Sequence, residues 1–148
     1  MPTFLAIDYG RKRIGLAIGD SGTGVSSPIA PVAGTGDEAR DVASIVEAAL
    51  SYGATEYVLG LPVNMDGTEG EQARITRRFG SKLKKAAKKP VHYWDERLSS
   101  SAAEEKLLDS GLQRKKRAAR LDSVAAQNIL QEFLDNLAAN PNLNHGDR

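Results

Sequence analysis

The stretch TFLAIDYGRKRIGLAI, residues 3–18, decides the fold class of this chain. It contains two short apolar segments, 3–7 and 14–18, separated by a charged turn that includes Gly10. Two apolar, β-prone segments around a glycine-containing turn predict a β-hairpin. The first strand leads directly into Asp8, so a carboxylate stands at the end of that strand.

Strands and helices alternate after this hairpin. Pro28 and Pro31 restrict the next strand to the edge of a sheet. Apolar residues that recur every three or four positions predict amphipathic helices between the later strands. The sequence predicts a third strand at 29–32, a helix at 37–52, a strand at 57–61, a helix with Ile75, Phe79, Leu83 and Ala87 along one stripe, a strand at 91–94, a helix at 101–110, a basic connector at 114–120 and a last helix at 121–137.

This order, β-β-β-α-β-α-β-α-α, predicts the α/β class. Consecutive strands favour antiparallel pairing, and strands separated by helices favour parallel crossovers. We therefore expect one five-stranded mixed sheet flanked by helices. It would form a single domain at 1–138, followed by a flexible C-terminal tail at 139–148.

The composition narrows the class of protein. The chain has 148 residues, 41% of them hydrophobic and 26% charged, which excludes collagen-like, mucin-like and fully disordered chains. It has no cysteine, which excludes a disulfide scaffold, a thiolate zinc site and a cysteine nucleophile. No apolar run approaches the ~18 residues of a membrane span, and a charge appears before any signal-peptide core. We expect a soluble, cytoplasmic protein that does not contact a membrane.

The formal net charge of +1 hides an uneven distribution. Residues 1–74 hold 5 basic and 10 acidic residues, whereas 75–148 hold 15 basic and 9 acidic residues. Most of the positive charge lies within 82–120, with 12 basic and 5 acidic residues. Such a segment can attract a polyanion, although basic helix faces also occur simply as solvated surface.

Three acidic residues are predicted to meet at one edge of the sheet. Asp8 ends the first strand and Glu96 follows the last one, and open α/β sheets bind ligands at the carboxyl ends of such strands. Asp122 shares a helical stripe with Ala126 and Ile129, which are core-forming residues. Carboxylates are preferred ligands of hard divalent cations, and paired ions support phosphodiester cleavage. The pattern therefore predicts a site for Mg²⁺ or Mn²⁺.

Two of the three acids, Asp8 and Asp122, also have a structural interpretation. Asp8 can simply open the turn beside Gly10, a common role for aspartate. Asp122 can cap free N–H groups at a helix start. Taken one at a time, these interpretations are at least as good as catalysis, and it is the convergence of all three acids that favours a metal site.

Two further groups of residues are candidates for phosphate contacts. Basic side chains near the acids can bind a nucleic-acid backbone without reading its sequence. The basic candidates are Arg11, Lys12, Arg13, Arg97, Arg114, Lys115, Lys116, Arg117 and Arg120. The second group is a loop, Asn64, Gly67 and Thr68, placed before a helix N-terminus where N–H groups can bind a phosphate. Ordinary loop and cap chemistry is the alternative there.

Four segments of the chain resemble the YqgF (RuvX) family. They are DYGRKRIGLA at 8–17, GLPVNMDGT at 60–68, DERLSS at 95–100 and DSVAAQNIL at 122–130. The four segments occur in the family's order and spacing, and the resemblance extends over about 3–137.

The resemblance implies a ribonuclease-H-like fold related to the junction resolvase RuvC. It also implies a metal-dependent phosphodiesterase with its acids at Asp8, Glu96 and Asp122. Family members are described as Holliday junction resolvases and as nucleases that mature the 5′ end of the small-subunit ribosomal RNA precursor. In one place the chain departs from the wider fold pattern, which often carries the second acid on the strand adjacent to the first. That strand here ends in Gly60-Leu61-Pro62, and Glu96 lies one strand further out.

Three functions remain open from the sequence. The first is a metal-dependent endonuclease, which acts on precursor ribosomal RNA or, as the alternative, on branched DNA; the resolvase alternative requires a two-fold homodimer. The second is a non-catalytic nucleic-acid-binding module that retains the acids as structural caps. The third is a phosphate-handling enzyme of the actin or sugar-kinase type, although such enzymes use two related domains and this chain supplies one.

Overall fold

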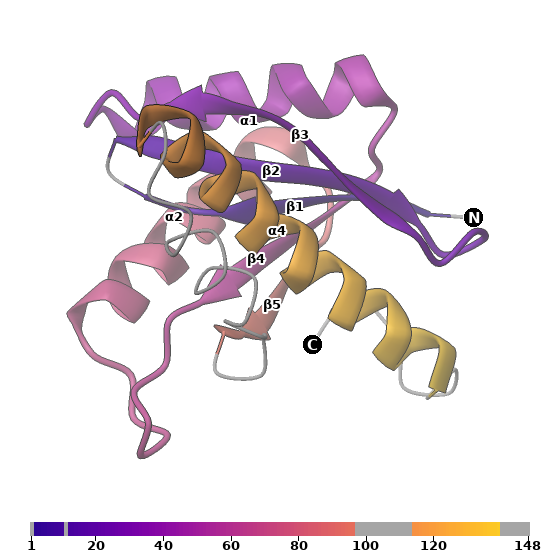
Figure 1. Cartoon of the computed structure of the whole chain (residues 1–148). Coiled ribbons are helices and arrows are strands. Elements are labelled where there is room, and N and C mark those ends of the chain that lie inside the picture. The colour runs from indigo at the N-terminus through magenta and orange to yellow at the C-terminus, as the bar shows by residue number, and fades with distance from the viewer. Residues whose placement is uncertain (1, 11, 97–113, 140–148) are drawn as a thin grey trace.

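The structure, a computed structural model, describes residues 2–10, 12–96 and 114–139; for 114–122 it describes the backbone alone. The elements follow the predicted order up to the last strand (Figure 1). They are β1 (Thr3–Asp8), β2 (Arg13–Asp20), β3 (Ser26–Ala33), α1 (Glu38–Tyr52), β4 (Glu56–Leu61), α2 (Glu71–Ala87), β5 (Val91–Asp95) and α4 (Arg114–Ala139).

The five strands form one mixed sheet in the order β3-β2-β1-β4-β5. β1 pairs antiparallel with β2, and β2 pairs antiparallel with β3. β4 lies parallel to both β1 and β5, so the carboxyl ends of β1, β4 and β5 meet at the same edge. The predicted five-stranded mixed sheet is confirmed, and β1 is central because the hairpin lies on one side of it and the crossovers on the other.

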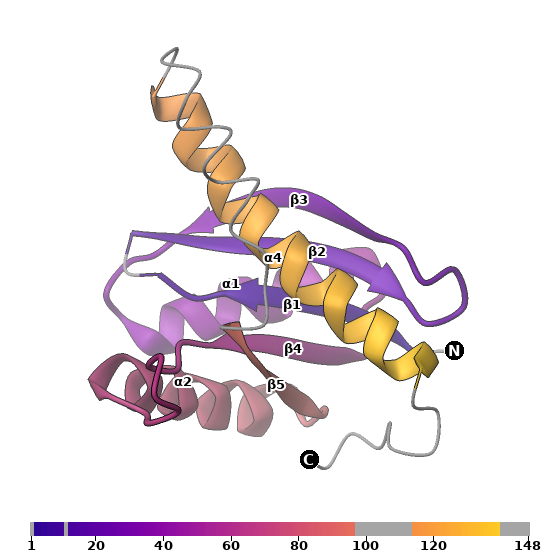
Figure 2. The same ribbon diagram turned by 60° about the horizontal axis from the view of Figure 1, so that its bottom comes forward.

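Helices cover both faces of the sheet and create two cores (Figure 2). On one face, α1 and α2 pack residues such as Ile45 and Phe79 against Leu5 and Ile7 of β1. On the other face, α4 packs its apolar stripe against the sheet. The buried residues of this second core are Phe4, Ala6, Ala17, Val58, Ala126, Ile129, Leu130, Phe133 and Leu134. Successive residues of a strand face opposite sides, so neighbours in β1 belong to different cores.

Local signals explain where α1 begins and ends. The Asp37 carboxylate accepts hydrogen bonds from the backbone N–H groups of Ala39 and Arg40, as an N-cap does. The helix ends at Gly53, whose φ of 70° is in the left-handed region that favours glycine. The helix predicted at 37–52 is therefore confirmed.

The start of the last helix differs from the prediction. The basic segment at 114–120 is not a connector, because α4 is helical from Arg114 onward. The segment consists of arginine, lysine and alanine, which are strong helix formers, and its charge has no bearing on that backbone preference. The helix predicted at 101–110 and most of the tail predicted at 139–148 lie outside the described residues.

The edge strand β3 is longer than the predicted 29–32 and contains an irregularity. Its register against β2 shifts between Ile14 and Leu16, where β3 contributes an extra residue. Hydrogen bonds hold α4 over this side of the sheet: the Ser123 hydroxyl donates to the Ile29 carbonyl at 2.8 Å, and the Gln131 amide donates to the Gly24 carbonyl. No helix in the described ranges is both long and apolar enough to cross a membrane.

Candidate functional site

The structure brings Asp8 and Glu96 to the same edge and the same face of the sheet. Asp8 is the last residue of β1, and Glu96 directly follows β5. Alternation along β1 places Asp8 on the face of Phe4 and Ala6, which is the face covered by α4. Trp94 lies on that face as well, in contact with the second core, and Glu96 is two residues further along. The strands thus bring both carboxylates to the α4 side of the carboxyl edge.

A glycine lies between these two acids. Ile7 pairs with Leu59, so the next position of the register sets Asp8 beside Gly60 on β4. A Cβ atom added at Gly60 would lie 3.2 Å from Oε2 and from Cγ of Glu96. The Glu96 side chain therefore extends inward over β4, toward β1. Asp8 has a second glycine neighbour, Gly15, directly opposite it on β2.

This arrangement narrows the gap that strand order creates between the acids. With one strand between them, the backbones of β1 and β5 stand about 9–10 Å apart. The Glu96 carboxylate crosses part of that distance because Gly60 has no side chain to block it. A hydrogen atom at position 60 is therefore a structural requirement of the candidate site.

Asp122 occupies the helix that covers this face. Residues Ala126 and Ile129, four and seven positions later, are buried against the sheet, so Asp122 falls on the sheet-facing stripe of α4 by helical register. The alternative that Asp122 caps the helix start does not hold, because α4 begins eight residues earlier, at Arg114. Its side chain lies outside the described part of the structure.

The residues present fit a hard divalent cation. Within the described ranges, no group of three or more histidine, aspartate or glutamate side chains is assembled for a metal ion, and the third predicted ligand, Asp122, lies outside them. Two observations support the fit: the donors are carboxylates, which Mg²⁺ and Mn²⁺ prefer, and a Cβ at Gly60 would fill the space beside the Glu96 carboxylate.

The predicted phosphate-binding cations are described only in part. Lys12 is exposed, and Arg13 begins β2 on the α4 face by alternation with Ala17. The Nη1 atom of Arg13 is buried and has no hydrogen-bond partner in the described part of the chain. Because a buried donor without a partner is costly, this guanidinium is suited to receive an anion. Arg11 and Arg97 lie outside the described residues, as do the side chains of Arg114, Lys115, Lys116, Arg117 and Arg120.

In the loop predicted to bind phosphate, N–H groups donate hydrogen bonds to acceptors within the loop itself. The Asn64 N–H donates to the Thr68 carbonyl, and the Gly67 N–H donates to the Asn64 carbonyl. Both the N–H and the hydroxyl of Thr68 donate to Asp66 Oδ1, at 3.0 and 2.6 Å. With these groups occupied and a carboxylate among them, the phosphate role predicted for Asn64, Gly67 and Thr68 is not part of the function proposed below.

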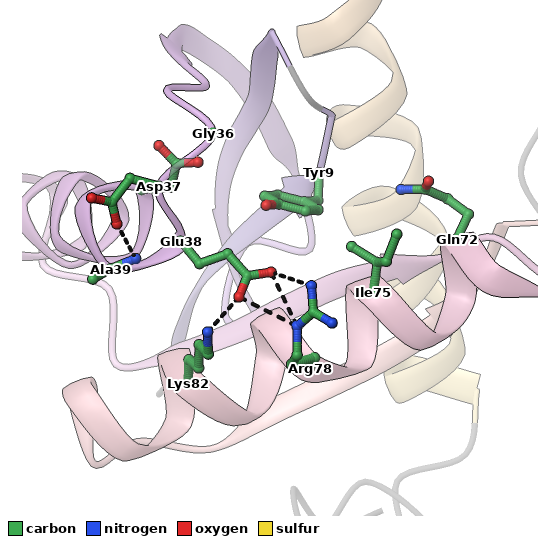
Figure 3. Close-up of a pocket in the computed structure, with 10 residues that line it drawn as sticks. Tyr9, Gly36, Asp37, Glu38, Ala39, Gln72, Ile75, Arg78 and Lys82 are labelled. Atoms are coloured by element: carbon green, nitrogen blue, oxygen red, sulfur yellow. Dashed lines mark hydrogen bonds and ion pairs between the residues drawn. The ribbon is translucent and has the colours of Figure 1, made fainter.

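A pocket of about 760 Å³ lies on the opposite face of the sheet, between α1 and α2 (Figure 3). Tyr9, the residue after Asp8, forms part of its wall and stacks on Phe79 with ring centroids 4.1 Å apart. Burial, together with the nearby carboxylates of Glu38 and Asp41, raises the pKa of the Tyr9 hydroxyl.

The charges of this pocket are balanced by one another. Glu38 accepts hydrogen bonds from Arg78 and from Lys82, and these bonds lower the pKa of its carboxyl. The buried Asp41 carboxylate accepts hydrogen bonds from the N–H and the hydroxyl of Thr35. These contacts hold α1 and α2 in place beneath the sheet.

Comparison with known proteins identifies the family. Residues 2–136 match the family model described as "RuvX: Holliday junction resolvase". The chain belongs to the RuvX family. It is 41% identical to the "Putative pre-16S rRNA nuclease" of Chloroflexus aurantiacus over 95% of this chain and 92% of that protein. A protein of the same description from Anaeromyxobacter dehalogenans is 44% identical over 90% of this chain and 97% of its own length.

Solved structures agree on the fold of this RuvX chain. Thermus thermophilus RuvC in complex with a Holliday junction substrate superposes with a TM-score of 0.58, covering 94% of this chain and 97% of RuvC. At 11% identity this likeness shows the fold alone, which is the ribonuclease-H-like fold that the resemblance implied. As a member of a nuclease family, this RuvX chain is a hydrolase that acts on nucleic acid.

The role of Gly60 was not predicted from the sequence of this RuvX chain. The segment 57–61 is predicted as a continuous buried strand, and the single glycine inside it is the sequence signal for a close approach. Glycine in a strand interior often marks a point where another group approaches closely. Here that group is the Glu96 carboxylate, together with Ile129 of α4, whose Cδ1 would lie 2.6 Å from an added Cβ.

Proposed function

We propose that this RuvX chain is a divalent-metal-dependent endonuclease that acts on structured nucleic acid and processes the 5′ end of the 16S ribosomal RNA precursor. The observation that carries the proposal is the meeting of Asp8 and Glu96 on one face of the carboxyl edge, across Gly60. The relatives described as pre-16S rRNA nucleases, which match over most of their own length, support the choice of substrate.

The three acids hold the cofactor in this proposal. Asp8, Glu96 and Asp122 bind Mg²⁺ or Mn²⁺, and the third acid joins from the sheet-facing stripe of α4. Such ions, when bound, neutralise charge on the scissile phosphate and make a water molecule a better nucleophile. The rigid positions of Asp8 at a central strand end and of Glu96 over Gly60 fix the direction of the carboxylates before substrate arrives.

Basic residues hold the nucleic-acid backbone beside the acids. Arg13 supplies a guanidinium on the same face of the sheet, with a buried N–H group that a phosphate oxygen can accept. Lys12 adds an exposed charge next to it. The remaining candidates from the sequence are Arg11, Arg97, Arg114, Lys115, Lys116, Arg117 and Arg120, which would add positive charge for contacts with the backbone. Such contacts set affinity and orientation and leave sequence choice to other groups.

Branched DNA is the second candidate substrate. The family description and the RuvC-like fold favour it, because RuvC was solved with a Holliday junction. A junction resolvase cuts two strands symmetrically, so this function requires a two-fold homodimer. Ribosomal RNA processing makes no such demand. In either case we place the protein in the cytoplasm, where precursor RNA and chromosomal DNA of bacteria are found.

One experiment tests the proposal and separates the two substrates. The purified protein is given a precursor 16S RNA fragment and a four-way DNA junction, with Mg²⁺, with Mn²⁺ and with a chelator. We expect metal-dependent cleavage of the RNA. We expect Asp8→Asn, Glu96→Gln and Asp122→Asn each to reduce cleavage by at least about 10²-fold, the loss typical of removing one group that stabilises transition-state charge.

Glu47→Gln is the matched control, because Glu47 is an exposed acid on α1, on the other side of the sheet. Unchanged cleavage by Asp8→Asn would refute the catalytic site. Cleavage of the junction alone would replace RNA processing with junction resolution. Tight binding without cleavage by the wild-type protein would identify a non-catalytic binding module.

A further inference from the structure

We propose that Met65 is a wedge that enters the base stack of the bound nucleic acid beside the cleavage site. The inference rests on the proposed nuclease function and deepens it, since it names the substrate class: nucleic acid whose stacked or paired bases must be opened where the strand is cut. The structural basis is a rigid, exposed methionine on the loop that leaves the carboxyl edge of the sheet.

Met65 is unusual in its exposure. Its side chain is 89% exposed, more than any other large hydrophobic residue that the structure describes as exposed. Keeping a methionine in water forgoes the free energy that burial of its apolar side chain would supply. Isolated apolar side chains do occur on protein surfaces, so exposure alone assigns no role. The position and rigidity of this residue supply the rest of the evidence.

Met65 lies on the loop that leaves the sheet edge of Asp8 and Glu96. The loop of residues 62–70 follows β4, the strand that lies between β1 and β5, and in Figure 1 it extends beyond the sheet before α2 begins. It therefore leaves the same edge at which Asp8 and Glu96 meet. A nucleic-acid strand that lies on those acids passes the base of this loop.

The loop is held in one shape by its own hydrogen bonds. Asn64 and Thr68 are joined twice, through the Asn64 N–H to the Thr68 carbonyl at 2.8 Å and through the Asn64 amide to the Thr68 hydroxyl at 3.0 Å. Gly67 completes the turn with a φ of 90°. A preformed backbone loses less conformational entropy on binding than a flexible one, so the loop can present the Met65 side chain at a set place.

Charge favours bases over phosphates as the partner of this tip. Asp66 and Glu69 flank the apex, and both are used inside the structure: Asp66 accepts from Thr68, and Glu69 forms a two-point ion pair with Arg77 at 2.7 Å. Carboxylates repel a phosphate backbone, whereas a methionine side chain packs well on flat, polarisable rings. Methionine is one of the residues that proteins insert between base steps.

The test uses protein in the Asp8→Asn background, without divalent metal, so that binding is measured without cleavage. The probes are a hairpin carrying the precursor 16S 5′ cleavage sequence and a four-way DNA junction, each with 2-aminopurine at the cleavage point or branch point. Unstacking raises the fluorescence of this base. We expect wild-type Met65 to produce the rise, and Met65→Ala to abolish it and weaken binding about tenfold, the loss of one stacking contact.

Two further variants make the result specific. Met65→Phe keeps a large apolar tip, and we expect it to restore both the fluorescence rise and the affinity. Leu50→Ala is the matched control, because Leu50 is also strongly exposed, at 70%, but lies in the last turn of α1 on the other side of the sheet. We expect it to match the parent protein. The melting temperature of each variant verifies that the fold is intact.

The wedge is overturned if Met65→Ala keeps the affinity and the fluorescence rise, or if Leu50→Ala loses as much as Met65→Ala. Failure of the proposed function has a different signature. If the wild-type protein never cleaves yet opens the bases in a Met65-dependent way, the role of Met65 is supported and the proposed nuclease function is refuted. If the wild-type protein cleaves and the Met65→Ala variant binds and opens the bases as before, the nuclease function is supported and the role of Met65 is refuted.

Discussion

Asp8 and Tyr9 are neighbours in the chain, yet they belong to two regions with different chemistry. Asp8 lies on the α4 face with Glu96, where glycine on both adjoining strands leaves room around a carboxylate. Tyr9 lies on the other face, stacked on Phe79 in a pocket whose acids are matched by Arg78, Lys82 and Thr35. Both regions are rich in acidic residues. They differ in what is described around the carboxylates: glycines adjoin Asp8, whereas Arg78, Lys82 and Thr35 bind the acids of the pocket, and we propose the cation site on the α4 face.

The largest effect is expected when a methyl group is added at one of two tightly packed glycines, Gly60 on the α4 side of the sheet or Gly80 on the α2 side. In Gly60→Ala, the new methyl group meets Ile129 and the Glu96 carboxylate. We expect a loss of about 1–3 kcal/mol in the free energy of unfolding. We also expect about a 10²-fold loss of cleavage, because a displacement of about 1 Å in a catalytic group has that effect. Cleavage assays below the unfolding temperature and denaturant unfolding measure the two effects.

Gly80→Ala is the control for this variant. Its methyl group meets the Tyr93 hydroxyl oxygen and Leu59 on the α2 side of the sheet. We expect a stability loss of similar size with unchanged cleavage per folded molecule. Equal loss of cleavage in both glycine variants would mean that general packing, rather than room for the Glu96 carboxylate, limits activity.

A smaller effect is expected at Tyr9. Tyr9→Ala removes the ring that stacks on Phe79, and we expect it to lower the free energy of unfolding by about 2 kcal/mol. Tyr9→Phe keeps the ring and should keep the stability. Thermal unfolding measures the change, and cleavage at low temperature should persist in both variants. A Tyr9→Phe protein that folds normally but no longer cleaves would give the hydroxyl a catalytic role and end the contrast between the two faces.

The smallest effect concerns the ion pairs of Glu38. Hydrogen bonds from Arg78 and Lys82 lower the pKa of Glu38 below its usual value of 4.5, so the ionised form stabilises the folded state above that pH. This contribution is lost as the pH falls through the lowered pKa of the folded protein. We expect Glu38→Gln to reduce the melting temperature slightly at pH 7, and the difference from wild type to shrink below pH 4.5.

The measurement is a series of melting curves from pH 7 to pH 3, with Glu47→Gln, on the same helix, as the control. Because the Arg78 and Lys82 side chains are largely exposed, added salt should also reduce the difference. A gap that persists unchanged at pH 3 would show that Glu38 stabilises the protein through packing and not through its charge.

Much of the fold follows from local patterns in the sequence. The hairpin around Gly10, the Asp37 cap and the alternation of helices and strands depend on short-range preferences, so they could be predicted. The start of α4 could not be predicted in the same way. The basic run at 114–120 is predicted as a connector because of its charge, although its arginine, lysine and alanine residues prefer a helix and α4 is helical there.

The candidate site was predicted less completely than the fold. Strand order was enough to expect Asp8 and Glu96 at one edge, since this depends on topology alone. The way Glu96 reaches over Gly60 depends on side-chain packing between β4, β5 and α4, which no single segment encodes. The hydrogen bonds that the Asn64 and Thr68 N–H groups make within their loop are local contacts, and the phosphate role of Asn64, Gly67 and Thr68 stays a prediction.

The bulge and the two prolines of β3 have a consequence for assembly. Pro28 and Pro31 remove two amide donors from the outermost strand, and the extra residue beside them twists its backbone out of line. A strand from another molecule would find no regular template there, so sheet extension stops at this border. Copies of this chain are thereby kept from joining through β3, which leaves β5 as the edge of the sheet without prolines.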